Sequence, residues 1–308
     1  MVKFHRVVWR VLAAAVAAAF ATPAFAQPAG ETAIPVDSAP AVEPLQVQAL
    51  RAGLSVVQGA GANVVVWAGP DGIALVDSGL AERAAELFET VARIAPGPLR
   101  LVIATHGHPD HTGGNAVAVA RGAVLIGHER LREAEPLEPA ADAATPAPMV
   151  TTADALSVHL NGERLDLVHV ADAHTSSDLV ARWAQADVVA LGGLFRNGQY
   201  PRVDLDAGGS FAGTVAAIES VLARAHARTL IVPGHGPVAT RAELAEYRDM
   251  LVAVGRRVRE AVERGESLET LQATRPTAAF DARYAHPGAS VAPAEFVATV
   301  YEELTRRR

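Results

Sequence analysis

The sequence predicts an α/β (α+β) protein built from helices and mixed β-sheets. Consecutive β segments come first along the chain, and strands then alternate with helices, which favours mixed sheets over purely parallel ones. The segment Leu101–Ala104 is short and wholly apolar, which is typical of a strand buried on both faces of its sheet. With 308 residues, half of them apolar, the chain is long enough for one large α/β domain or two small ones.

Residues 1–26 have the pattern of a signal peptide. Lys3, Arg6 and Arg10 precede the ten-residue apolar run Val11–Phe20, and Ala24-Phe25-Ala26 offers small residues at the two positions that a signal peptidase reads. The run is about half the length that a membrane-spanning helix needs. An Ala-rich amphipathic helix at a flexible terminus is the structural alternative. We expect cleavage after Ala26 and export to the periplasm or medium, with no stable membrane anchor afterwards. Because the segment holds three basic and no acidic residues, cleavage would change the net charge from −7 to −10.

Residues 27–45 are rich in Pro, Ala and small polar residues and indicate a flexible linker. Residues 46–308 are expected to form the folded domain, with C-terminal helices from about residue 241. Apolar periodicity and turn residues predict ten strands in it, namely Leu54–Gln58, Asn63–Ala68, Ile73–Val76, Leu101–Ala104, Ala123–Ile126, Ser157–Leu160, Leu165–Val170, Leu179–Trp183, Val188–Leu191 and Thr229–Val232. Helical spacing predicts Ala81–Ile94, a helix from near Asn115, Phe211–Ala225, Arg241–Gly265 and Ala292–Arg306, and Glu133–Pro148 is expected to be a loop.

Composition excludes several classes of function. The net charge of −7 and the lack of any dense run of basic residues argue against nucleic acid as a partner. The chain has no cysteine, which excludes disulfides, thiolate metal ligands and a lipid-modified N-terminal cysteine. Lys3 is the only lysine, so a mature chain would have no side-chain amine for Schiff-base chemistry. A small-molecule substrate is the expected partner, and the oligomeric state stays open.

The segment from Thr105 to Asn115 carries the strongest chemical signal. Three histidines and one aspartate fall within six residues directly after the apolar strand, namely His106, His108, Asp110 and His111. His106 and His108 are two residues apart, so in extended backbone they project to the same side. Asp110 and His111 are adjacent and must diverge, which suits two neighbouring metal ions better than one. Imidazole and carboxylate groups at this density indicate a metal site rather than a polar surface loop.

Two more histidines follow apolar strands. His174 lies after Leu165–Val170, and His235 lies after Thr229–Val232. Either histidine alone would more often be structural than a ligand. Placed at strand ends, as the first cluster is, both can converge with it on one edge of the sheets.

These motifs resemble the metallo-β-lactamase superfamily: the HxHxDH pattern, a later His-Thr and a final Pro-Gly-His-Gly, in that order from about residue 54 onward. The resemblance implies an αββα sandwich of two mixed sheets flanked by helices, with a two-zinc site at the sheet edge. It assigns the first zinc to His106, His108 and His174, and the second zinc to Asp110, His111 and His235. It also implies that Asp77 supports the metal loop without binding metal.

One position departs from many members of that family, which have an aspartate bridging both metals after a late strand. Here Gly193 stands at that position, and a subclass of lactamases manages with the six ligands that remain. We therefore expect the second zinc to bind more weakly than the first. Arg196, three residues later, is a candidate for meeting a substrate carboxylate at the rim of the site, the alternative being an exposed loop arginine.

The predicted function is that of an exported zinc-dependent hydrolase that uses metal-bound hydroxide to cleave an amide, ester, thioester or lactone, a β-lactam being one candidate. Asp110 is the candidate catalytic residue that orients the hydroxide and handles its proton. The alternative is an exported metal-binding or accessory protein whose catalysis is weakened by the loss of the bridging aspartate. The remaining mature histidines lack ligand spacing and are expected to be structural or solvated, namely His128, His159, His169, His226 and His286.

Overall fold

The computed structural model describes residues 44–134 and 149–306, all within one compact unit of the chain. The expected signal peptide and residues 27–43 of the expected linker lie outside the described residues. The strands are β1 (Gln46–Ala49), β2 (Leu54–Ala60), β3 (Ala62–Gly69), β4 (Gly72–Val76), β5 (Leu99–Ile103), β6 (Val124–His128), β7 (Met149–Thr152), β8 (Ala155–Leu160), β9 (Glu163–His169), β10 (Leu179–Trp183), β11 (Val188–Ala190), β12 (Leu230–Val232) and β13 (Ala239–Thr240). The helices are α1 (Ala84–Ile94), α2 (Pro109–Thr112), α3 (Asn115–Ala120), α4 (Leu131–Ala134), α5 (Phe211–Arg224), α6 (Arg241–Glu263), α7 (Leu268–Ala273), α8 (Asp281–Tyr284) and α9 (Pro293–Arg306).

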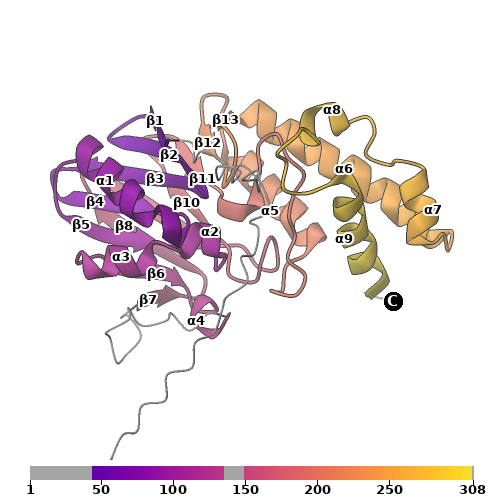
Figure 1. Cartoon of the computed structure of the whole chain (residues 1–308), viewed down its shortest axis with the longest axis horizontal. Coiled ribbons are helices and arrows are strands. Elements are labelled where there is room, and N and C mark those ends of the chain that lie inside the picture. The colour runs from indigo at the N-terminus through magenta and orange to yellow at the C-terminus, as the bar shows by residue number, and fades with distance from the viewer. Residues whose placement is uncertain (1–43, 135–148, 307–308) are drawn as a thin grey trace, which may run out of the picture. The chain divides into compact units, whose positions relative to one another are not determined.

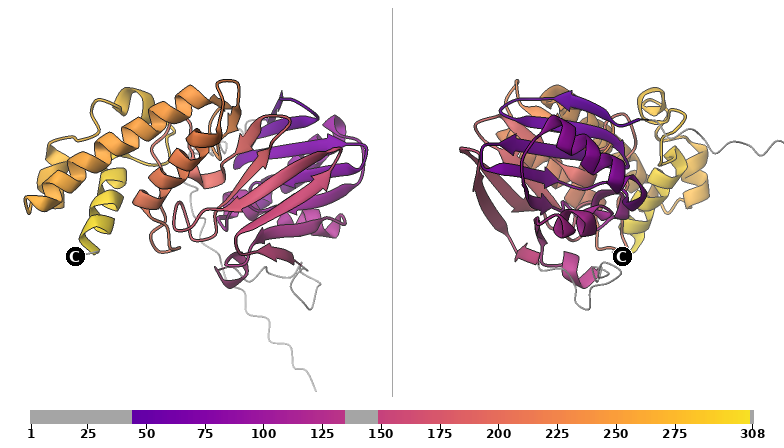
Figure 2. Two further views of the ribbon diagram at one scale, coloured as in Figure 1. Left: turned by 180° about the vertical axis from the view of Figure 1, so that it is seen from behind. Right: turned by 60° about the vertical axis from the view of Figure 1, so that its left-hand side comes forward.

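Two mixed sheets form the centre of the fold (Figures 1 and 2). The first sheet has the order β1 to β7, antiparallel up to β4 and parallel from β4 to β7. The second has the order β13-β12-β11-β10-β9-β8, with one parallel pair between β11 and β12. The expected mixed sheets are confirmed.

The side chains between the sheets explain why the sheets stack face to face. Alternate residues of both sheets form one buried apolar cluster, in which Trp67 of β3 meets Trp183 of β10 edge to face with ring centroids 6.0 Å apart. The opposite faces are covered by helices. α1 and α3 pack on the first sheet, and α5, α6 and α9 join the outer face of the second in a separate cluster. These layers make the αββα sandwich that the resemblance implied.

Several short elements differ from the sequence prediction. The sequence does not predict six of the short elements, each six residues long or shorter, namely the strands β1, β7 and β13 and the helices α2, α7 and α8. The expected loop Glu133–Pro148 begins within α4, and residues 135–148 lie outside the described residues. The expected helix Ala81–Ile94 opens with a 3-10 turn, Ala81–Arg83, before the α-helix starts. In the two described ranges, no helix is long and apolar enough to cross a membrane.

Candidate metal centre

The six predicted ligands come from three loops at one edge of the two sheets. His106 and His108 follow β5, and Asp110 and His111 lie in the short helix α2, which begins with Pro109 at its first position. His174 follows β9, and His235 follows β12. Among the described residues, two groups bring potential ligand atoms within 4.8 Å of one another: His106 with His108 and His174, and Asp110 with His111 and His235. The structure thus assembles the two ligand sets that the resemblance implied.

Asp77 holds the loop from Thr105 to His111 in place by hydrogen bonds. It follows β4 in a left-handed backbone conformation, with φ of 63°, and is buried. Its Oδ1 accepts the backbone N–H of Thr105 at 2.8 Å, and its Oδ2 accepts both the Thr105 hydroxyl at 2.9 Å and His111 Nδ1 at 2.6 Å. These contacts agree with the supporting role implied for Asp77.

In the first group, each histidine has one ring nitrogen bound to an acceptor. His174 Nδ1 donates to the carbonyl of Arg202 at 2.5 Å, and His108 Nε2 donates to Asp204 Oδ2 at 2.9 Å. His106 Nδ1 lies 3.0 Å from the Thr105 hydroxyl, whose own proton goes to Asp77, so His106 donates there. A neutral imidazole carries one proton only, so the other nitrogen of each ring is left with a lone pair.

Those three lone pairs converge on one point. His106 Nε2 lies 3.1 Å from His108 Nδ1 and 3.1 Å from His174 Nε2, and the latter two atoms are 2.9 Å apart. None of the three has a proton to offer to the others, so a cation is the partner that suits them. Nitrogens that bind one tetrahedral zinc at about 2.0–2.1 Å are about 3.4 Å apart. The first group therefore fits zinc within a few tenths of an ångström.

Electrostatics keep two histidines of the first group, His106 and His174, neutral. Burial and the neighbouring histidines lower the pKa of His106 and of His174 well below the ordinary value. Neutral imidazole is the form that binds metal, so no proton has to leave these two rings.

The second group is less tightly held. His111 Nε2 lies 3.8 Å from Asp110 Oδ2, and His235 Nε2 lies 3.0 Å from the same oxygen. In spite of that distance, the buried His235 Nε2 has no aligned hydrogen-bond partner among the described residues, which fits an atom suited to bind a cation. Burial lowers the pKa of His235 to about 4. Burial also opposes the charge of His111, but the Asp77 carboxylate overrides it and raises the pKa of His111.

Asp110 is ionised in this setting. Burial would raise its pKa, but the close contact with His235 and the charge of His111 hold the pKa well below its usual range. Its side chain keeps 33% of its surface exposed, more than any histidine in the two groups. Among the six candidate ligands, Asp110 therefore has the most exposed side chain.

Gly193 lies against the first group and not in open space. It belongs to the 3-10 turn Gly192–Leu194 after β11, and a Cβ built on it would lie 2.0 Å from His174 Cδ2 and 2.3 Å from His174 Nε2. The expected position of this segment at the site is therefore correct. Gly193 does not have a positive φ, whereas the neighbouring Gly192 does, at 49°. The His174 ring is therefore what excludes a side chain at Gly193.

Arg196 is not at the rim of the site, as the sequence analysis expected, nor is it an exposed loop residue. It is 7% exposed, and its Nη2 donates to the Ser290 hydroxyl at 2.5 Å and to Gln199 Oε1 at 3.3 Å. Its positive charge helps to lower the pKa of His235, after burial. Arg196 is thus a buried cation near the second group, and its contact with substrate stays a prediction.

Two further residues near the site were missed by the sequence analysis. Asp204 orients His108, but it lies in an irregular segment where no spacing distinguishes it from Asp206. The buried Asp178 accepts the backbone N–H and hydroxyl of Thr175, at 2.8 Å each, and so fixes the loop that carries His174. Its place in the polar run Thr175-Ser176-Ser177-Asp178, directly after His174, is the signal that could have pointed to it.

The histidines outside the two groups have other surroundings. His128 and His169 stack with ring centroids 3.7 Å apart, and each binds a backbone carbonyl. Neither joins a three-ligand group among the described residues. The remaining three are exposed, namely His159, His226 and His286.

Fold and site together define an αββα protein with a candidate two-site metal centre at one edge of its sheets. The family model of the metallo-β-lactamase superfamily matches residues 57–255. Because this is more than half of the chain, the protein belongs to the metallo-β-lactamase superfamily.

Solved structures with the same fold are distant in sequence. A metallo-β-lactamase from Pontibacter korlensis is 20% identical, with a TM-score of 0.57, and the match covers 68% of this chain and 99% of that one. The inverting sec-alkylsulfatase Pisa1 from Pseudomonas sp. is 18% identical, with a TM-score of 0.64, and the match covers 84% of this chain and 50% of that one. The chain thus spans half the length of the alkylsulfatase. No curated protein matches the chain in sequence.

Proposed function

We propose that the protein is an exported zinc-dependent hydrolase that cleaves an amide, ester, thioester or lactone bond. The observation that carries this proposal is the convergence of six ligand atoms in two adjoining groups, whose His106 and His111 rings are 4.2 Å apart. The first group presents three unprotonated nitrogens to one point. The only donors are imidazole nitrogens and one carboxylate, a set that suits zinc.

The chemistry expected of zinc here is that of a Lewis acid, which lowers the pKa of bound water toward about 7 and polarises a substrate carbonyl. The protein's own contribution is positional. Asp110 is ionised and partly exposed, so it can accept a hydrogen bond from the attacking water and orient it. Its low pKa makes it a weak base, so orientation is its main contribution. His106 and His174 stay neutral and fixed by their acceptors.

The test combines metal analysis with a substrate panel. Purified protein should contain zinc, lose hydrolysis when a chelator removes it and regain hydrolysis when zinc returns. The panel should hold β-lactams, lactones, thioesters and carboxylic esters. It should also hold a secondary alkyl sulfate, because a sec-alkylsulfatase is among the similar folds. Full hydrolysis in the zinc-free protein would contradict the proposal.

A second candidate is an exported metal-binding or accessory protein with weakened catalysis. The steric exclusion of any side chain at Gly193 favours it, because no carboxylate from that position can bridge two metals. The same experiment separates the two candidates. Stoichiometric zinc without turnover of any substrate in the panel would favour the accessory protein.

Export is a separate part of the proposal and rests on the pattern of residues 1–26. N-terminal sequencing of protein from the periplasm or medium of a bacterial host should begin at Gln27. Soluble cytoplasmic protein that retains Met1 would contradict export and leave the hydrolase proposal standing.

A further inference from the structure

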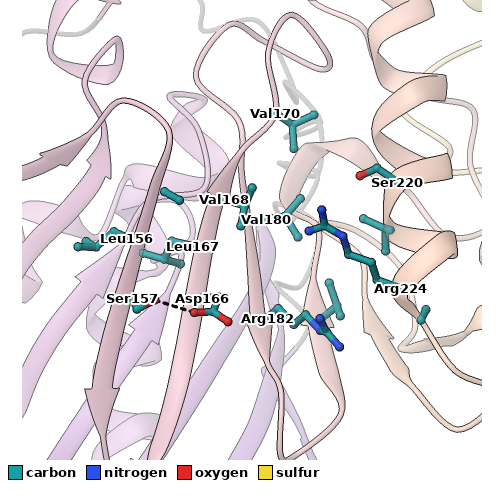
Figure 3. Close-up of a pocket in the computed structure, with 14 residues that line it drawn as sticks. Leu156, Ser157, Asp166, Leu167, Val168, Val170, Val180, Arg182, Ser220 and Arg224 are labelled. Atoms are coloured by element: carbon teal, nitrogen blue, oxygen red, sulfur yellow. Dashed lines mark hydrogen bonds between the residues drawn. The ribbon is translucent and has the colours of Figure 1, made fainter.

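A groove lies on the outer face of the second sheet, away from the metal ligands. It has a volume of about 250 Å³ and lies between strands β8 to β11 and the C-terminal half of α5 (Figure 3). None of the six candidate metal ligands lines it. Its volume is near the lower limit of ligand pockets, which are about 300–1,000 Å³, so it suits a small molecule.

Strand alternation makes the floor of this groove apolar. On β9 and β10, Leu165, Leu167, Ala181 and Trp183 point into the core between the sheets, so their neighbours must point outward. α5 covers only part of that outer face. The floor consists mainly of valines from the strands and the helix, namely Val168, Val170, Val180, Val189 and Val221.

Two arginines stand over this floor from opposite walls. Arg182 comes from β10, and Arg224 comes from the last turn of α5. Figure 3 shows both side chains reaching into the space between the strands and the helix, with the Arg224 guanidinium directed toward Val180. Within residues 44–134 and 149–306, neither guanidinium has an ion pair or a hydrogen bond.

The acidic residue that lines the groove does not neutralise these charges. Asp166 accepts the Ser157 hydroxyl at 2.7 Å and pairs with Arg164 at 2.9 Å. Two positive charges therefore remain beside a valine floor, on a chain whose net charge is −7. Such a site attracts an anion that carries an apolar body.

We propose that this groove binds a small amphipathic organic anion. Its carboxylate, or an anion of similar shape, lies between Arg182 and Arg224, and its alkyl chain covers the valines. Burial of the ligand's alkyl chain and pairing of its anionic group with the two arginines both contribute to binding. A second copy of the chain is a poorer occupant, because two such faces would bring four arginines together.

Octanoate is a suitable probe, with 1-octanol as its uncharged analogue. Isothermal titration calorimetry should give one octanoate per chain with 1-octanol at least about tenfold weaker. Zinc-loaded and chelated protein should bind octanoate equally, because the groove shares no residue with the metal centre. This independence also separates the inference from the proposed hydrolase function.

Two variants test the assignment, each checked for folding by thermal melting. Arg182→Gln/Arg224→Gln should weaken octanoate binding about tenfold and leave 1-octanol unchanged. Val168→Glu should abolish octanoate binding by placing a carboxylate in the groove, and Val168 is partly exposed, so the fold should tolerate it. The matched control, Arg132→Gln/Arg228→Gln, removes two exposed arginines that do not line the groove, and it should bind as the wild type does.

Three outcomes would overturn the proposal. They are the absence of saturable octanoate binding, wild-type affinity in the folded Arg182→Gln/Arg224→Gln variant, and binding that chelation or His108→Ala removes. A last experiment measures binding of the protein to vesicles that contain anionic phospholipid. Arginine-dependent vesicle binding without binding of free octanoate would identify a membrane surface as the partner and reject the small ligand.

Discussion

The two candidate ligand groups lie side by side, yet they differ in how firmly the protein holds them. In the first group, Thr105, Asp204 and the Arg202 carbonyl each fix one histidine ring. In the second, among the residues that the structure describes, only His111 has such a hydrogen bond, which it makes to Asp77. The second group is also the more open, because Asp110 is one-third exposed.

Acceptors that bind the far nitrogen of a histidine ligand raise metal affinity, because they set the tautomer and hold the ring in place before the ion arrives. In the first group, folding has already ordered all three histidine rings. In the second group, it has ordered the ligands only in part. The second group gains from its one anionic ligand, Asp110, but nothing at Gly193 can add another. We therefore expect one tight and one weaker zinc site, each assigned to a named group.

Removing a ligand from the first group should give the largest effect. His108→Ala takes away one of three converging nitrogens, so the tight zinc should be lost. Hydrolysis should fall more than about 100-fold, beyond the range for changes in residues that only orient a ligand. Zinc titration with a chromophoric chelator measures the first change, and turnover of the best panel substrate measures the second. His159→Ala, which removes an exposed histidine on β8, is the matched control. An intact tight site in His108→Ala would mean that the groups are assigned wrongly.

Gly193→Asp is expected to damage the first group instead of strengthening the second. Although a carboxylate here could bridge two metals in principle, its Cβ would overlap the His174 ring. The tight site should weaken about 10- to 100-fold, as when a ligand is misplaced. Gly193→Ala should do the same, because the Cβ alone causes the overlap. Zinc titration of the folded variants measures the affinity of both sites. If the weaker site binds zinc more tightly while the tight site is unchanged, His174 can move aside and this prediction is wrong.

Asp204→Asn tests whether the carboxylate that binds His108 makes the first group the tighter one. The amide can still meet His108 Nε2 but carries no charge, so the tight site should lose about 10- to 100-fold in zinc affinity. The weaker site should change little. Asp206→Asn, two residues away with a side chain 92% exposed, is the control. Equal effects of the two variants would show that general charge near the site, and not the orientation of His108, matters.

The sequence predicted which residues the structure brings together as candidate ligands, because their positions follow from regular structure. Apolar strands placed His106, His174 and His235 at strand ends, and stacked sheets bring such ends to one edge. The order and type of the long elements were predictable for the same reason. Short elements such as β13, with two residues, carry no periodicity from which they could be recognised.

What the sequence did not predict depends on contacts between distant segments. Asp204 reaches His108 across 96 residues, and Ser290 reaches Arg196 across 94. Such pairs are set by loop paths, for which the sequence offers no periodic signal. Gly193 shows the same limit, because the sequence located the missing carboxylate, and only the packing against His174 showed why no side chain fits there.

The smallest expected effect concerns Asp178, which lies behind the first group and fixes the loop of His174. Burial raises the pKa of Asp178 to about 7, in spite of its hydrogen bonds from Thr175. An aspartate in an unfolded chain has a pKa of about 3.9, so the folded state binds a proton that the unfolded state releases. The stability that this proton contributes is fully present below about pH 4 and is lost as the pH rises through 7.

In zinc-free protein, the free energy of unfolding should therefore fall more steeply between pH 4 and 7 in the wild type than in Asp178→Asn. The difference in slope should correspond to at most one proton. Urea unfolding at a series of pH values measures both slopes, and the difference between them cancels the other titrating groups. The variant also loses part of the Thr175 contact, which lowers its stability at every pH and leaves the slope as the informative quantity. Parallel slopes would mean that Asp178 is ionised in the folded protein, so that a fixed negative charge, and not a neutral carboxyl, lies behind the first ligand group.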